Sequence, residues 1–268
     1  MRASSSPAAR PATWSRIPTC RGPTLALELK VDALSASYGA VRALEGVSIS
    51  VREGEAVALL GTNGNGKSTL MKCLTGLVTP RAGSITLTID GTAHNLIGKG
   101  PQEIVELGVA MVAEGRRLFP RLTVEENLFL GAYRPAARAS LAKNLEFCYA
   151  TFPVLKERRR QLAGSMSGGQ QQMVAIARAL MSAPRLLLVD EPSVGLSPLL
   201  VSQTIEKIGE LNRKHGMTVL MAEQNFHQTV KIAHRGYVLV HGEIAFESRD
   251  VAELENNEVV KNLYLGAS

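Results

Sequence analysis

A glycine-rich stretch constrains the fold of this chain more than any other feature. Residues 61–69 read Gly-Thr-Asn-Gly-Asn-Gly-Lys-Ser-Thr and fit the pattern G, four residues, G-K-[ST]. The apolar run 55–60 before them has the length of a buried strand. The apolar residues after them recur at helical spacing, as Leu70, Met71, Leu74 and Leu77. The glycines are therefore predicted to form a turn between a strand and a helix.

Such a turn is predicted to bind a polyphosphate. Gly61, Gly64 and Gly66 let the backbone aim successive N–H groups into one concavity, and the start of the helix adds partial positive charge. Lys67 has the reach to contact the outer phosphates, and the Ser68 hydroxyl is placed to ligate Mg²⁺. A chance match to the pattern, or a turn that binds nothing, are the alternatives.

Length and composition bound the remaining possibilities. The 268 residues allow one large domain or two small ones, and 45% of them are apolar, which is ordinary for a globular protein. No apolar stretch approaches the roughly 18 residues that span a bilayer, so a soluble or peripheral protein is expected. The three cysteines form no CxxC pair, which favours a reducing compartment over disulfides or a zinc site: Cys20, Cys73 and Cys148.

The net charge of +6 is a weak indication of any partner. Four of its positive charges precede the first acid, Glu28, and are Arg2, Arg10, Arg16 and Arg21. They lie in segment 1–24, which is rich in Arg, Ser, Pro and Ala and lacks the apolar core of a secretory signal. We expect a disordered extension there; an organellar transit peptide and a misassigned start codon are alternatives.

The order of predicted elements is a β layer, the glycine turn, a helical segment and two β-α units. Strands are predicted at 25–34, 47–51, 55–60, 84–90, 108–113, 186–189 and 218–222, with turns at 37–39, 52–54 and 80–83. Helices are predicted from 101, from a capping box at 123–126 through to 162, after 170 as far as Pro184, at 198–214 and at 251–265, with a hairpin around 241–243. The charge run 156–160 is interpreted as a solvated helix face.

Four motifs in this order resemble the ATP-binding cassette (ABC) ATPases of membrane transporters. They are Tyr38, the turn 61–69, Ser167-Gly168-Gly169-Gln170, and the strand 186–189 with Asp190 and Glu191. The resemblance covers about residues 25–266. It implies an α/β P-loop NTPase with a mixed central sheet, an N-terminal antiparallel β layer and a helical insertion. The expected division is one domain at 25–268, with a RecA-like core and β layer at 25–113 and 163–268 and a helical subdomain at about 114–162.

The resemblance also implies a role for each matching residue. Tyr38 is expected to stack on adenine, although a packed turn tyrosine is the alternative. The phosphates of ATP are expected to contact Gly61, Thr62, Asn63, Gly64, Asn65, Gly66, Lys67, Ser68 and Thr69. Mg²⁺ is expected at Ser68, Asp190 and Glu114, and the catalytic residues are expected to be Glu191, Gln224 and Lys67. A structural salt bridge is the alternative for Glu191. Ser167, Gly168, Gly169 and Gln170 are expected to close over ATP held by a partner subunit.

The segments 114–128, 222–225 and 263–266 resemble one of the two ATPase subunits of bacterial branched-chain amino-acid importers. Three departures from most cassettes support that subfamily: Glu114 replaces a glutamine, Gln224 a histidine and Ser197 an aspartate. Met166 in place of the usual leucine is a volume-conserving change.

The implied function is ATP hydrolysis that energises import of leucine, isoleucine and valine. The implied partners are a second ATPase subunit or a second copy, two membrane permeases and a periplasmic or lipid-anchored binding protein, at the cytoplasmic face of the bacterial inner membrane. Importers of urea, short amides or aromatic acids remain open. A cassette acting on DNA or ribosomes is disfavoured because no coiled-coil insertion is present, and no nucleic-acid partner is expected. A GTPase is disfavoured because no Asn-Lys-x-Asp motif occurs.

Overall fold

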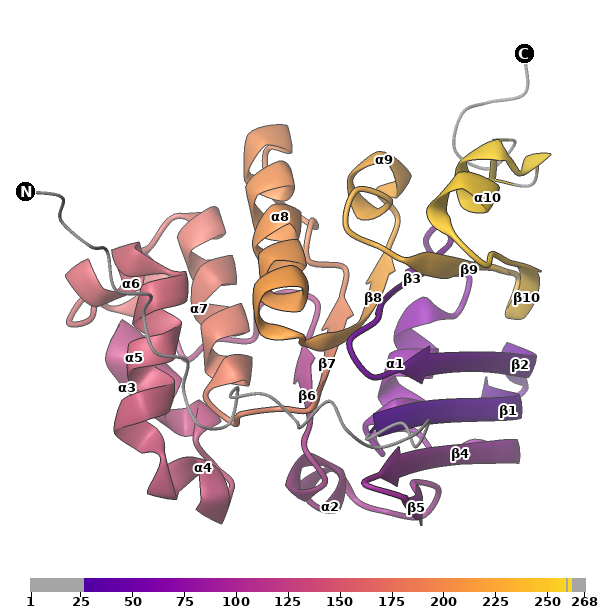
Figure 1. Cartoon of the computed structure of the whole chain (residues 1–268), viewed down its shortest axis with the longest axis horizontal. Helices are drawn as coiled ribbons and strands as arrows, with labels where there is room; N and C mark the ends of the chain where they lie inside the picture. The colour runs from indigo at the N-terminus through magenta and orange to yellow at the C-terminus, as the bar shows by residue number, and fades with distance from the viewer. Residues whose placement is uncertain (1–26, 259, 262–268) are drawn as a thin grey trace, which may run out of the picture.

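The computed structural model describes residues 27–258, 260 and 261, which form two sheets with helices packed around them (Figure 1). The first sheet has four strands in the order β2-β1-β4-β5, and the second has six in the order β10-β9-β3-β8-β7-β6. The extension predicted at 1–24 and the segment 263–266 lie outside the described residues. No helix within the described part of the chain has the length and apolar content needed to cross a bilayer.

The first sheet is the expected antiparallel layer, but its first hairpin is longer than predicted. Its strands are β1 (Leu27–Tyr38), β2 (Val41–Arg52), β4 (Ala82–Ile89) and β5 (Thr92–Asn95). The prediction ended β1 at Leu34 because the apolar alternation breaks there. An irregularity in the pairing near Ala33, whose φ is 47°, shifts the register, and the strand then continues to Tyr38. The turn predicted at 37–39 is therefore at Gly39 and Ala40.

The second sheet is parallel except at one edge. Its strands are β3 (Ala56–Leu60), β6 (Val109–Val112), β7 (Leu186–Asp190), β8 (Thr218–Glu223), β9 (Arg235–Val240) and the antiparallel β10 (Glu243–Glu247). Side chains alternate between its two faces. Leu187 and Val189 of β7 belong to one core, and Leu186 and Leu188 belong to the other.

Helices cover both faces of this sheet. They are α1 (Lys67–Leu74), α2 (Pro101–Glu106), α3 (Val124–Gly131), α4 (Pro135–Ala139), α5 (Leu141–Thr151), α6 (Pro153–Glu157), α7 (Gly168–Leu180), α8 (Pro198–His215), α9 (Phe226–Thr229) and α10 (Val251–Asn256), with a 3₁₀ turn at Ala163–Ser165. Helix α1 packs in the core shared with the antiparallel sheet, whereas α7 and α8 pack in the other core with α3, α5 and α6. Figure 1 shows α1 and α7 on opposite sides of β6 and β7.

Helix ends follow local chemistry. The capping box predicted at Thr123 is confirmed, since Thr123 Oγ1 accepts from Glu126 N at 3.2 Å and Glu126 Oε2 accepts from Thr123 N at 2.7 Å. Helix α8 ends at Gly216 as expected, because Gly216 has φ of 67°. One expectation was wrong, because Leu77 lies beyond α1 and is exposed. The helix predicted at 251–265 is interrupted: α10 ends at Asn256, Asn257 is extended, and Glu258, Val260 and Lys261 are helical again. Residues 262–265 of that prediction lie outside the described residues.

The helices α3 to α6 form an excursion whose two ends meet. Thr123 and Leu162 pair as an isolated β-bridge, and Leu122 O accepts from Ala163 N at 2.9 Å. The excursion packs on α7 through buried residues that include Leu128, Phe152 and Leu155. The start and the end of the excursion therefore lie side by side.

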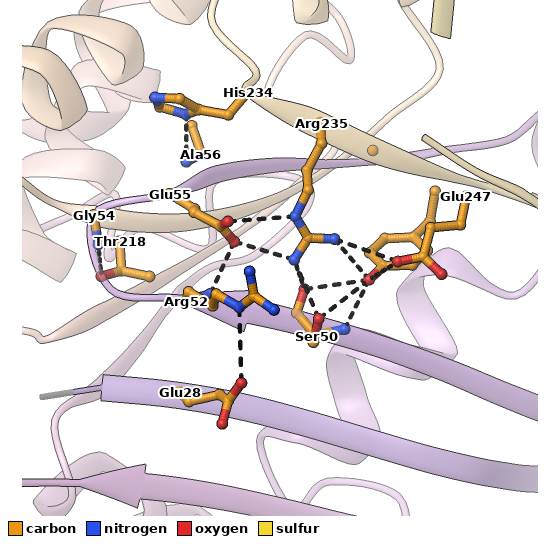
Figure 2. Close-up of polar contacts among 12 residues, drawn as sticks. Glu28, Ser50, Arg52, Gly54, Glu55, Ala56, Thr218, His234, Arg235 and Glu247 are labelled. Carbon is orange, nitrogen blue, oxygen red and sulfur yellow. Dashed lines mark hydrogen bonds and ion pairs between the residues drawn. The ribbon is translucent and has the colours of Figure 1, made fainter. Parts of the chain in front are cut away.

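A polar cluster joins the two sheets at the end of β3 away from the glycine turn (Figure 2). Arg235, at the start of β9, donates from Nη2 to Glu55 Oε2 at 3.1 Å and to Ser50 O at 2.7 Å. Its Nη1 donates to Tyr237 Oη at 2.7 Å and lies 3.7 Å from Glu247 Oε1. This half-buried guanidinium uses its planar fork to tie β2 to β9.

Candidate active site

The predicted strand-to-helix turn is confirmed and lies between β3 and α1. Gly66 has φ of 100°, and a Cβ placed on it would stand 2.5 Å from the carbonyl oxygen of Ala43 in β2. A side chain is thus excluded there by both conformation and space. Asn65 fixes the turn from within, because its Oδ1 accepts from His241 N at 3.1 Å and its Nδ2 donates to Thr62 Oγ1 at 2.9 Å.

The Lys67 ammonium lies inside this turn. Its Nζ donates to Gly61 O at 2.6 Å and to Thr62 O at 3.1 Å, and it lies 2.8 Å from Glu191 Oε1. The Lys67 and Glu191 side chains are only 4% and 6% exposed. A buried ion pair of this kind is costly to break from one side, because the remaining charge loses its partner.

Ser68 and Asp190 meet as the motif predicted. Ser68 Oγ, on the first turn of α1, donates to Asp190 Oδ1 at 3.1 Å, and Asp190 is the last residue of β7. The pKa of Asp190 is raised to about 6, chiefly by burial and also by the negative charges of Glu191 and Glu114, whereas the Ser68 hydrogen bond and the Lys67 charge lower it. The Ser68 hydroxyl and the Asp190 carboxylate are hard oxygen ligands of the kind that suits Mg²⁺.

Asp190→Asn is expected to stabilise the metal-free chain, and more so at pH 8 than at pH 5. The folded-state pKa of Asp190, about 6, lies above the ordinary value of 3.8, so ionisation of this carboxyl group disfavours the folded state. The folded chain therefore loses stability as pH rises from 3.8 through 6, and the loss is complete at pH 8. The gain at pH 8 should be on the order of 1–3 kcal/mol, allowing for partial solvent screening. Denaturant unfolding in EDTA at both pH values measures it. An equal gain at both would show that the Asp190 charge is not the cause.

Glu191 is held in a strained backbone position. Its φ is 48°, unusual for a residue with a side chain, and its N–H donates to Ala222 O in β8 at 2.9 Å. Its Oε2 accepts from Gln224 N at 3.3 Å. The Glu191 carboxylate therefore lies between Lys67 on one side and the loop after β8 on the other.

Three further predicted residues, Glu114, Gln224 and Tyr38, are exposed and lie in segments around the glycine turn and the ends of β7 and β8. Glu114 is exposed in the loop after β6, yet its charge acts on Asp190. The Gln224 side chain is exposed at the end of β8. Tyr38 is 46% exposed at the end of the hairpin whose return strand contacts the turn at Gly66. An exposed aromatic ring in that hairpin fits stacking on a planar base.

The motif at 167–170 caps α7. Ser167 Oγ accepts from Gln170 N at 3.4 Å, and Gln170 Oε1 accepts from Ser167 N at 3.2 Å. Because α7 and α1 pack on opposite faces of the parallel sheet, the starts of these two helices belong to different sides of the molecule. The chain therefore carries two helix N-termini suited to anions.

Two residues at the site were not assigned a role from the sequence. Glu223 is fully buried and accepts hydrogen bonds from Ser193, Gln224 and Asn225. Arg116 donates to Gly195 O at 3.2 Å and to Gln171 Oε1 at 3.3 Å. The only sequence feature that could have singled out Glu223 is its position as an acid at the end of an otherwise apolar strand. No sequence feature singled out Arg116.

The fold and the site define a P-loop nucleotide-binding protein: a glycine turn between a buried parallel strand and a helix, with the helix serine bonded to an aspartate that ends a neighbouring strand. Comparison with known proteins specifies the class further. The family model for ABC transporters matches residues 44–194. This chain belongs to the ATPase subunits of that family.

Three proteins similar to this chain show what members of the family do. The high-affinity branched-chain amino acid transport ATP-binding protein BraG of Pseudomonas aeruginosa is 46% identical, over 89% of this chain and 99% of its own length. The ADP conformation of MJ1267, an ATP-binding cassette of an ABC transporter, has a TM-score of 0.75 at 28% identity, covering 90% of this chain and 99% of MJ1267. The dimeric post-hydrolysis MJ0796, bound to ADP and Pi, has a TM-score of 0.68 at 26% identity, covering 82% and 97%.

Proposed function

We propose that this chain hydrolyses ATP to energise import of the branched-chain amino acids leucine, isoleucine and valine through membrane permeases. The arrangement of Lys67, Ser68, Asp190 and Glu191 around the glycine turn carries the ATPase part of the proposal. The 46% identity to BraG along almost the whole of both proteins supports the substrate class.

The contacts of Lys67 suggest how ATP binding prepares the site. Its ammonium already has two backbone carbonyls of the glycine turn and Glu191 as partners. The γ-phosphate of ATP takes over as the anionic partner of Lys67, which frees the Glu191 carboxylate to accept a proton from the attacking water. Ser68 and Asp190, with Glu114 nearby, would hold Mg²⁺, whose charge would neutralise that on the phosphate oxygens. Tyr38 stacks on adenine.

Gln224 stands at the end of β8, beside Glu191, and its uncharged amide contacts the γ-phosphate. Because an amide donates without carrying positive charge, this contact is weaker than the charge-assisted one a protonated histidine makes. The backbone N–H of Gln224, which lies 3.3 Å from Glu191 Oε2, orients the catalytic carboxylate.

A second ATPase subunit, or a second copy of this chain, completes the site. Residues 167–170 cap a helix on the face opposite α1, which supports contact with nucleotide bound by a partner rather than with their own. The related MJ0796 is dimeric. We assign residues 25–113 and 163–268 to the nucleotide-binding core and about 114–162 to a helical subdomain. That subdomain contacts two permeases at the cytoplasmic face of the inner membrane, and a periplasmic or lipid-anchored binding protein supplies the substrate.

Deletion of this gene is expected to abolish high-affinity uptake of labelled leucine in its host. Uptake in the parent strain should be competed by excess isoleucine and valine, because permeases and binding protein of this class recognise the shared aliphatic amino acid. Complementation with the wild-type gene should restore uptake, and complementation with Glu191→Gln should not. Unchanged leucine uptake in the deletion strain, with loss of urea or short-amide uptake, would reassign the substrate.

A further inference from the structure

Glu223 is a buried carboxylate that joins two loops beside the active site. Its Oε1 accepts from Ser193 N at 2.9 Å. Its Oε2 accepts from Ser193 Oγ at 2.9 Å and from Gln224 N and Asn225 N at 3.0 Å each. The residue is 0% exposed. One side chain therefore ties the start of loop 192–197, after β7, to the backbone that follows β8.

The Gln224 N–H is shared between two carboxylates. It lies 3.0 Å from Glu223 Oε2 and 3.3 Å from Glu191 Oε2. Any displacement of Glu223 therefore changes the bond from Gln224 N to Glu191 Oε2, which joins Glu191 to the loop after β8. Burial and the charge of Glu191 raise the pKa of Glu223, while its N–H and O–H donors oppose that shift. Four neutral donors make this a strong but strictly oriented contact.

Loop 192–197 also accepts a hydrogen bond from Arg116, which follows β6. Arg116 Nη2 donates to Gly195 O, and Arg116 Nη1 donates to Gln171 on α7. A Cβ on Gly168, the first residue of α7, would stand 3.2 Å from Arg116 Nη2, so the guanidinium lies against the start of that helix. The loop thus connects the first turn of α7, through Arg116 and Gln171, with Glu223.

We infer that Glu223 is a positioning residue that makes loop 192–197 and Gln224 move together, so that displacement at the start of α7 changes the position of Glu191. This inference rests on the proposed hydrolysis. It assigns Glu223 no contact with nucleotide or water. Its consequence is that a partner docking against 167–170 alters turnover through Arg116, Gly195, Ser193 and Glu223.

Glu223→Gln is expected to break the connection of Glu223 to loop 192–197 and to keep its bonds to the backbone after β8. A glutamine keeps one oxygen acceptor, and with that oxygen at the Oε2 position its NH₂ group faces the Ser193 N–H, donor against donor. We expect this repulsion to displace Ser193, so that its Oγ also loses the Oε2 oxygen and the whole connection to loop 192–197 is cut, while the bonds from Gln224 N and Asn225 N remain. We expect kcat for ATP in the full-length chain to fall about tenfold, with the Kd of a fluorescent ATP analogue within about twofold of wild type.

Ser193→Ala removes the other half of the same tie and is expected to lower kcat about threefold. The double variant should lose no more than Glu223→Gln alone, since both substitutions cut one connection. Asn212→Ala is the matched control: this buried amide also joins two segments, donating to Gly54 O and Met217 O, but at the opposite end of β3. It should lower the melting temperature and leave kcat within twofold.

The inference would be overturned by unchanged kcat in both Glu223→Gln and Ser193→Ala, by multiplicative losses in the double variant, or by an equal fall in kcat for Asn212→Ala. Loss of nucleotide affinity in step with kcat would also overturn it, because it would make Glu223 a general structural residue. A wild-type chain that binds but never hydrolyses ATP would instead refute the proposed function.

Discussion

Replacing Glu191 by glutamine is expected to lower the steady-state rate of ATP hydrolysis by at least about a hundredfold while ATP still binds. The substitution keeps the size of the side chain and an oxygen that accepts from Gln224 N. It removes the proton acceptor next to the turn, and it also removes the negative charge that pairs with Lys67. Because Lys67 no longer has a competing carboxylate, affinity for ATP should be retained or increased. Phosphate release and equilibrium binding, measured on the same preparation, separate these two effects.

Glu55→Gln is the matched control for this variant. Glu55 is also a carboxylate in an ion pair, with Arg235 at 3.1 Å, but it lies at the end of β3 away from the glycine turn (Figure 2). Its substitution should leave turnover within about twofold. Wild-type turnover in Glu191→Gln would remove Glu191 from the chemistry. An equal loss in both variants would indicate general damage to the fold.

The contacts at the centre of the site were predictable because of strand order and motif spacing. Parallel strands bring their carboxyl ends to one edge of a sheet, so a strand that ends in Asp190 and a helix that begins beside Ser68 meet there. The glycine pattern further required a sharp turn, which Gly66 provides. Local patterns also gave the capping box at Thr123 and the end of α8 at Gly216.

Element ends were less predictable where tertiary packing decides them. Strand β1 continues to Tyr38 because β2 and β4 pair with it across an irregularity that breaks its alternation. Apolar spacing placed Leu77 on α1, but the chain turns away after Leu74 and exposes it. The short strand β5 was missed because residues 92–95 show no apolar alternation, and it forms by pairing with β4.

The contacts of Glu223 and Arg116 could not be predicted from the sequence, for a different reason. Each acts across a gap of many residues, from Glu223 to Ser193 and from Arg116 to Gly195. Propensity and periodicity describe neighbours along the chain, whereas these contacts depend on which loops the sheet order brings together. The ion pair between Lys67 and Glu191 belongs to the same category, although both residues were already assigned to the site.

Lys67→Ala is expected to weaken ATP binding by about a hundredfold or more, because the turn loses its buried cation. The variant should also be less stable by on the order of 3 kcal/mol, since Glu191 is left buried without its partner. These two losses have different causes, and a second substitution separates them. In Lys67→Ala/Glu191→Gln the unpaired charge is gone, so much of the stability should return, while ATP affinity should stay low.

Denaturant unfolding and equilibrium binding of ATP, on wild type, both single variants and the double variant, complete the cycle. If affinity recovered together with stability in the double variant, the ammonium would have no contact with the phosphates, and Lys67 would serve only to neutralise Glu191. If stability failed to recover, the contacts of Lys67 with Gly61 O and Thr62 O, rather than its ion pair, would be what holds the turn. We expect low affinity in a stable double variant. The Lys67 ammonium lies within the glycine turn, where its three oxygen partners hold it in place to contact a bound phosphate.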